Sequence, residues 1–338
     1  MSFHQTLLQS ISKGPLKLVD VVWYLLYEKA LWKNSAKRIR NLQQKVSLSE
    51  ESRDKKMVSL SIPPYEGENP KIKKLVRYIE PIEDSLKAVL LHGSLASNDA
   101  ISYSDLDALL VIKDETLQDQ AKLAQTLERA HHAQYIFAEY DPLQHHGWFV
   151  LTEEMLKDFP ETYFPHIILE RSKSLIPQSK LEFDIAIGKK GEAEFQRPFF
   201  ELAISLRRNL QKPLSDQNVY TIKSILSQFM LLPALFLQAI RQTGIDKKSS
   251  FELALKYFSK EEWKVMNEVS AIRENWSYTL NAWQEYLLTN PNYLLRKWGR
   301  RFAPKLKGDI KTQVEQLSAE NMLSLIALME LKLKKRRG

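Results

Sequence analysis

Two short apolar runs in the middle of the chain constrain its fold more than any other feature. The first, 88–91, leads into a Gly-Ser turn at Gly93, and the second, 106–112, begins after a stretch of small and polar residues. Short apolar runs beside turn residues are typical of strands that are buried on both faces. Two later segments are also predicted to be strands, and the second alternates apolar with acidic residues: 147–151 and 181–187.

Helical periodicity dominates the rest of the sequence. Only 10 of the 338 residues are glycine, which argues against a turn-rich all-β fold and favours a helical majority. Pro233 lies inside the longest apolar helical segment and is expected to kink it. We therefore predict an α+β fold with a small mixed sheet. The segments predicted to be helices are 1–55, 71–79, 115–137, 199–210, 219–240, 250–257, 261–288 and 314–333.

A proline-rich stretch divides the chain. Residues 61–70, SIPPYEGENP, hold three prolines and a glycine, which interrupt helices and strands alike. All four predicted strands follow this stretch, and from about residue 192 onward the pattern is helical. The sequence predicts three parts, which are an N-terminal helical segment 1–60, an α/β domain 61–190 and a helical C-terminal domain 191–338 with a basic end.

The net charge of +8 comes from one end of the chain. Residues 291–338 hold 12 Lys and Arg against 4 Asp and Glu, while the other 290 residues balance at 37 of each. A basic end attracts phosphates, so nucleic acid is one partner that this end predicts. A solvated basic tail explains the same charge without a partner.

The chain contains no cysteine, which excludes disulfides, thiolate nucleophiles and cysteine zinc sites. Its N-terminus lacks the pattern of a signal peptide. The most apolar stretch, 225–240, is too short to span a bilayer and contains Gln228 and Gln238. We therefore expect a cytoplasmic protein with no transmembrane segment.

The turn after the first apolar run has the composition of an anion site. Gly93 and Ser94 form a turn in which the backbone can approach a ligand closely, because glycine has no side chain. Small polar residues follow, and they are consistent with a short helix that begins there. A helix N-terminus presents free N–H groups, which bind phosphates.

Two aspartates open the second apolar run. Asp105 and Asp107 lie two residues apart, so on a strand they share one face while Leu106 enters the core. Two carboxylates this close repel each other unless a cation lies between them, and oxygen ligands select Mg²⁺ or Mn²⁺. Removal of either charge is then expected to keep or raise stability. The alternative is a solvated loop followed by two exposed aspartates at a strand edge.

Gly93-Ser94, ten intervening residues and Asp105-Leu106-Asp107 together resemble the signature of the DNA polymerase β-like nucleotidyltransferase superfamily. The resemblance implies a mixed sheet with flanking helices, two Mg²⁺ (or Mn²⁺) ions and transfer of a nucleoside monophosphate from an NTP, such as ATP, without a template. Gly93 and Ser94 would hold the β- and γ-phosphates, and Asp105 and Asp107 the metals. The acceptor hydroxyl would belong to a small molecule, an RNA or a protein.

The superfamily pattern also implies a third carboxylate on a later strand. Asp184, on the predicted strand 181–187, is the candidate catalytic residue for that place. His145 and His146 instead occupy the mouth of the strand 147–151, where a histidine could orient the attacking hydroxyl, act as its base, or be an ordinary loop residue. If no third carboxylate is present, the alternative is a catalytically inactive protein that keeps the fold and binds nucleotide or nucleic acid. A further alternative is an adaptor that uses the helical half as a partner surface.

Overall fold

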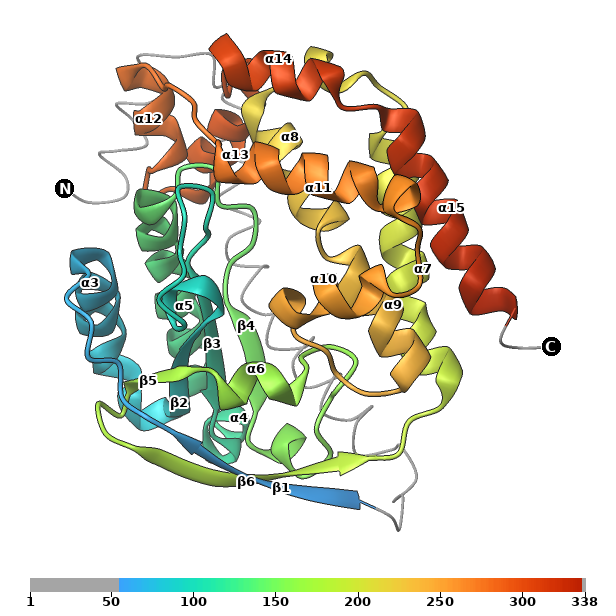
Figure 1. Cartoon of the computed structure of the whole chain (residues 1–338). Helices are drawn as coiled ribbons and strands as arrows, with labels where there is room; N and C mark the ends of the chain where they lie inside the picture. Colours follow the sequence, from blue (N-terminus) through green and yellow to red (C-terminus); the bar gives the residue numbers. More distant parts are fainter. Residues whose placement is uncertain (1–54, 336–338) are drawn as a thin grey trace.

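The structure, a computed structural model, describes residues 55–335 and confirms a mixed α+β fold (Figure 1). Its main sheet has the strand order β4-β3-β2-β5. β2 is antiparallel to both β3 and β5, and β3 is parallel to β4. The predicted mixed sheet is therefore present. Its strands are β2 (Leu86–His92), β3 (Asp107–Ile112), β4 (Phe149–Thr152) and β5 (Lys173–Ile176).

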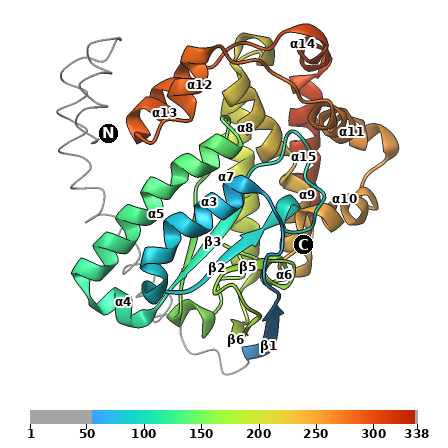
Figure 2. The same ribbon diagram turned by 90° about the vertical axis from the view of Figure 1, so that its left-hand side faces the viewer.

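The two central strands are buried on both faces, as their unbroken apolar sequences predict. Val89 and Leu91 of β2 pack in one cluster with residues of α3 (Pro70–Ile79) and α5 (Gln120–Tyr140), which cover that face of the sheet (Figure 2). Ala88 and Leu90 point the other way, into a cluster that includes residues of the second sheet. Helices thus cover one face of β2 and β3, and the second sheet packs against the other face. This packing fixes the positions of the ends of both strands.

The second sheet consists of β1 (Lys55–Ile62) and β6 (Leu181–Gly188), which pair antiparallel along their whole length and run beneath the main sheet in Figure 1. Residues 55–60 were predicted to close the N-terminal helical segment, and this is wrong, because they form a strand. Val58, Leu60 and Ile62 alternate with polar residues, which is the period of a half-buried strand. The helices predicted within 1–54 lie outside the described residues.

The chain is helical from Glu192 to its last described residue, and most of the predicted helices are present with shorter bounds. The segment 219–240 forms two helices, because the chain breaks at Met230 and Leu231 before Pro233 starts the second one. The segment 261–288 also divides, since Asn281 caps a new helix by accepting a hydrogen bond from the Gln284 N–H. These helices are α7 (Glu192–Asn209), α8 (Val219–Phe229), α9 (Leu232–Arg241), α10 (Lys247–Leu255), α11 (Lys260–Glu274), α12 (Ala282–Leu288), α13 (Tyr293–Arg301), α14 (Gly308–Gln316) and α15 (Ala319–Lys335).

Short helical turns connect the strands of the α/β half. They are η1 (Glu80–Ser85), η2 (Gly93–Leu95), α4 (Asp114–Gln118), η3 (Glu154–Leu156) and α6 (His166–Glu170), with η4 (Leu214–Asp216) in the helical half. The short helix predicted from the small residues after Ser94 is not present, because η2 is a single 3₁₀ turn over Gly93–Leu95 and residues 96–98 form a turn. β5 and α13 were not predicted, since β5 has only four residues and α13 is rich in charge.

Within residues 55–335, one stretch, Val219–Arg241, is long and apolar enough to cross a membrane by length and composition alone. In the structure, 61% of its most apolar window is buried inside the fold. Its residues, among them Ile222, Phe229 and Phe236, lie at the centre of the large helical core. The apolarity of this stretch is therefore explained by its place in that core.

Candidate active site

The Gly93 turn lies directly against one of the predicted carboxylates. His92, the last residue of β2, pairs with Asp107, the first residue of β3. Gly93 follows with a φ of +69°, and a Cβ placed there would lie 2.6 Å from Oδ2 of Asp107. Among the described residues, the half-buried Ser94 donates no side-chain hydrogen bond. Glycine is therefore required both by the backbone conformation and by the nearby carboxylate.

We expect Gly93→Ala to destabilise the protein and to displace the Asp107 carboxylate. Gly308 is a matched control, because its φ is +63° and no atom lies within 4 Å of a Cβ placed there. The left-handed backbone costs about 1–2 kcal/mol for alanine at either position. Urea unfolding should show a larger loss for Gly93→Ala than for Gly308→Ala, and equal losses would contradict the contact with Asp107.

Gln144, which precedes the two histidines, fixes the Asp-Leu-Asp segment. Its side-chain Oε1 accepts a hydrogen bond from the Leu106 N–H at 2.9 Å, and its Nε2 donates to the Leu106 carbonyl, also at 2.9 Å. Nε2 donates a further bond to the His146 carbonyl at 3.1 Å. One buried amide thus holds the backbone between Asp105 and Asp107 beside the backbone of His146.

Both histidines face the carboxylate pair, and neither is an isolated loop residue. Nε2 of His146 lies 3.4 Å from Oδ2 of Asp105 and 3.2 Å from Oδ1 of Asp107. Nδ1 of His145 lies 3.6 Å from Oδ2 of Asp105, and it is buried with no hydrogen-bond partner. His145 and His146 therefore both lie beside the carboxylate pair.

The predicted third carboxylate, Asp184, is not brought to this cluster. It lies on β6 in the two-stranded sheet, opposite Ser59, whose hydroxyl donates to its Oδ1 at 2.6 Å. The side chain is exposed. The alternation of 181–187 correctly predicted a strand, but this strand pairs with β1 and does not join the sheet that carries Asp105 and Asp107. The assignment of Asp184 to the catalytic group is therefore corrected.

A buried lysine from the helical half reaches the site, and it was not predicted. Lys223 of α8 is 0% exposed, and its Nζ lies 2.8 Å from Oδ1 of Asp105 and 2.5 Å from Oδ2 of Asp141. The ring of Tyr103 lies under the same ammonium, with its centroid 4.9 Å from Nζ. Lys223 is the one charged residue in the apolar sequence 219–240, which was the signal that could have revealed it.

Two more cationic side chains surround the cluster and were likewise missed. Lys247, at the start of α10, interacts electrostatically with Asp105 and Asp107; its burial, and then the charge of Arg273, lower its pKa to about 7. The Arg273 guanidinium lies over the Tyr103 ring at 4.7 Å, and its Nε is buried without a hydrogen bond. The helical half thus presents positive charge to the carboxylates of the sheet.

The pKa values of the two aspartates are shifted in opposite directions. Burial, with the charge of Asp105 added, raises the pKa of Asp107 to about 6. Burial acts in the same sense on Asp105, but the hydrogen bond from His146 and the charge of Lys223 outweigh it and hold the pKa of Asp105 far below its usual range. Burial lowers the pKa of His145 to about 4, so this ring is neutral at pH 7. A neutral imidazole and an ionised carboxylate can both coordinate a metal ion, so these two neighbouring groups are potential ligands.

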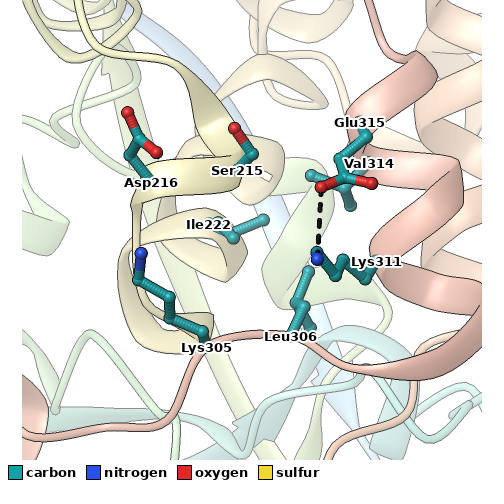
Figure 3. Close-up of a pocket in the computed structure, with 8 residues that line it drawn as sticks. All are labelled: Ser215, Asp216, Ile222, Lys305, Leu306, Lys311, Val314 and Glu315. Atoms are coloured by element: carbon teal, nitrogen blue, oxygen red, sulfur yellow. Dashed lines mark ion pairs between the residues drawn. The ribbon is translucent and has the colours of Figure 1, made fainter.

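A cavity in the helical half is separate from this cluster. It has a volume of about 290 Å³ and lies between η4, α8 and α14 (Figure 3). Lys311 pairs there with Glu315 at 3.5 Å, and Lys305 and Asp216 also line it. None of the predicted site residues borders this cavity.

No protein-family model matches the sequence, and the search of curated proteins finds no similar one. Among solved structures, one that matches is the crystal structure of a spectinomycin adenyltransferase from Enterococcus faecialis, determined with ATP and spectinomycin. The two chains are 11% identical, with a TM-score of 0.30, and the match covers 73% of this chain and 97% of the other. At this distance the chemistry of the site has to be argued from its own residues.

Proposed function

We propose that the chain is a template-independent nucleotidyltransferase, which transfers a nucleoside monophosphate from an NTP to an acceptor hydroxyl. The observation that carries this proposal is the close approach of the Gly93 turn to Asp107, 2.6 Å between a Cβ at Gly93 and Oδ2. The proposal rests on this neighbourhood, in which the Gly93 turn would bind phosphate beside Asp105 and Asp107 where two adjacent strands meet. Metal-triphosphate chemistry needs both groups within reach of one ligand.

Each group of the site has a part in this proposal. Gly93 and Ser94 would hold the triphosphate, and Lys247 would add positive charge beside it. Asp105 and Asp107 would hold a divalent cation, which when bound offsets the charge of the phosphates and lowers the pKa of the attacking hydroxyl. The acceptor oxygen forms a bond to the α-phosphorus while the bond to the bridging β-phosphate oxygen breaks. Pyrophosphate leaves, and the hydroxyl proton passes to solvent on the side where Asp107 is 24% exposed.

The fold identifies neither the acceptor nor the cellular compartment, so both belong to the proposal. We keep a small molecule, an RNA and a protein as acceptor classes and expect cytoplasmic activity. The direct test uses each NTP labelled at the α-phosphate, with Mg²⁺ or Mn²⁺ and a cell extract. Label should enter an extract component only with active protein and divalent cation. Absence of labelling with every NTP, together with retained nucleotide binding, would overturn transfer.

A second candidate is a nucleotide-binding protein without catalytic activity. Two observations favour it, namely that Asp184 lies in another sheet and that Lys223 already pairs with Asp105. This candidate predicts that the protein binds NTP and Mg²⁺ but never releases pyrophosphate. Pyrophosphate release measured beside nucleotide affinity separates it from the enzyme.

Ser94→Ala is expected to weaken triphosphate binding about 10- to 100-fold, because a hydrogen bond to a charged group contributes roughly 1.5–3 kcal/mol. Asp184→Ala is the matched control, since that exposed side chain lies in the second sheet. Calorimetry with a non-hydrolysable NTP should show normal affinity for the control. Equal affinity of Ser94→Ala and the wild type would remove the turn from the nucleotide site.

A separate proposal is that the basic C-terminal end binds a nucleic-acid acceptor. Lys332 to Lys335 close α15, where cations also favour the helix dipole, and residues 336–338 lie outside the described residues. Deletion of residues 334–338 should weaken RNA binding and flatten its salt dependence if this end binds phosphates. A protein that binds no polyanion in a salt-sensitive way would leave the other acceptor classes.

A further inference from the structure

Four potential metal-ligand atoms lie in the neighbourhood of His146. They are Oδ2 of Asp105, Oδ1 of Asp107, Nδ1 of His145 and Nε2 of His146. Within the described part of the chain, Asp105, His145 and His146 also form a group whose ligand atoms all lie within 4.8 Å of one another. Half of this set is nitrogen, which the Gly-Ser and Asp-x-Asp motif alone does not predict.

The separations between these atoms are those of ligands around a single cation. Bonds of about 2.0–2.2 Å, in tetrahedral or octahedral geometry, place neighbouring ligand atoms about 3.0–3.6 Å apart. The measured separations from His146 Nε2 to the two carboxylates are 3.4 and 3.2 Å, and His145 Nδ1 lies 3.6 Å from Asp105. No large movement is needed for the ligand atoms of Asp105, His145 and His146 to share an ion.

One ligand atom is left without a partner by the protein itself. Nδ1 of His145 is buried and makes no hydrogen bond, and the whole side chain is only 18% exposed. A buried polar atom without a partner is unfavourable, and most such atoms in folded proteins are satisfied. A cation beside Oδ2 of Asp105 would satisfy this nitrogen where it lies.

Lys223 limits the cluster to one ion. Its ammonium takes Oδ1 of Asp105 at 2.8 Å and also binds Asp141, so only Oδ2 of Asp105 faces the histidines. The ammonium is fully buried and supplies a fixed positive charge on the side where a second cation would need ligands. Within residues 55–335, Asp105 is the one carboxylate in the mutually close group, and Asp107 adjoins that group through His146 at 3.2 Å.

We infer that Asp105, His145 and His146 hold a single first-row transition-metal ion of the Co²⁺ or Zn²⁺ type, with Asp107 as a fourth ligand and Lys223 in place of a second cation. Imidazole nitrogen suits these ions, whereas Mg²⁺ prefers oxygen ligands and retained water. The inference concerns the site of the proposed function, but it requires only metal binding and no transfer.

The test uses the full chain, stripped of metal with EDTA and titrated separately with Mg²⁺, Co²⁺ and Zn²⁺ by calorimetry, with visible absorption of the Co²⁺ form. We expect one equivalent of Co²⁺ or Zn²⁺ to bind, at least about 100-fold more tightly than Mg²⁺, with absorption bands that report nitrogen ligands. His145→Gln and His146→Gln should each weaken Co²⁺ binding by about 100-fold or more, since even outer partners of a ligand contribute about 10- to 100-fold.

His132→Gln is the matched control, because His132 lies on α5 and pairs only with Glu128, at 4.0 Å, among the described carboxylates. It should bind Co²⁺ as the wild type does. Mg²⁺ binding as tight as that of Co²⁺, or two equivalents of Co²⁺ in the wild type, would overturn the inference whether or not the variants fold. NTP transfer with Mg²⁺ and no Co²⁺ binding would refute the inference alone, while Co²⁺ binding without transfer would refute only the enzyme.

Discussion

Lys223→Met is expected to lower the free energy of unfolding by about 3–5 kcal/mol, because it leaves the buried carboxylates of Asp105 and Asp141 without their cation. The two carboxylates are only 11% and 7% exposed, so water replaces the lost ammonium poorly. Methionine is close to lysine in length, and the expected loss is therefore one of charge rather than of volume. Urea unfolding in EDTA at pH 7.5 measures it.

Lys248→Met is the control for loss of a lysine ion pair at the surface. Lys248 pairs with Asp99 but is 75% exposed, and such pairs contribute about 0–1 kcal/mol. A second control combines Lys223→Met with Asp105→Asn and Asp141→Asn, which removes the unpaired charges and should recover most of the stability. A loss of similar size in Lys248→Met, or no recovery in the triple variant, would contradict the buried-charge explanation.

The pH dependence of the Lys223→Met defect follows from the same charges. Burial already raises the pKa of Asp141 in the wild type, and Lys223 lowers the pKa of both carboxylates, so loss of the ammonium raises the folded-state pKa of both from their wild-type positions. Their contribution is then lost as the pH rises through those raised values and is fully present below the unfolded value of about 4. The difference between variant and wild type should therefore be largest at neutral pH and shrink on acidification.

The turn and the aspartates were predictable because local sequence determines both. Gly93 is required by its own φ of +69°, and Asp105 and Asp107 flank the buried Leu106, although only Asp107 lies within β3. These features depend on residues within a few positions of each other. They therefore leave a clear mark in a single sequence.

The partners of the aspartates were not predictable, because they come from distant parts of the chain. Lys223 lies 118 positions beyond Asp105, and only the contacts of α8 with the segment before β3 bring them together. Asp184 is the opposite case. Its local sequence correctly predicts a strand, but that strand belongs to the other sheet. Which strands pair depends on the whole fold rather than on any short segment.

Lys223 also changes what the sequence predicts for Asp105. Repulsion between the two aspartates predicted that removal of either charge would keep or raise stability. The ion pair between Asp105 Oδ1 and Lys223 makes Asp105→Asn destabilising instead, because the buried ammonium would lose one of its two carboxylates. The prediction of unchanged or raised stability is therefore kept for Asp107 alone, because burial raises its pKa even with His146 at 3.2 Å.

Asp107→Asn is expected to reduce transfer by about 100-fold or more while raising the stability of the metal-free protein. In the wild type, burial raises the folded-state pKa of Asp107 to about 6, above its unfolded value. The stability that this carboxyl contributes is therefore present below about pH 4 and is lost as the pH rises through 6. Asparagine has no such loss, so the variant should gain on the order of 1–2 kcal/mol over the wild type above pH 6 and nothing near pH 4. Unfolding in EDTA across this range measures the gain, and pyrophosphate release measures the activity. A variant that loses both stability and activity would show that Asp107 supports the fold, whereas one that keeps its activity would remove Asp107 from the chemistry.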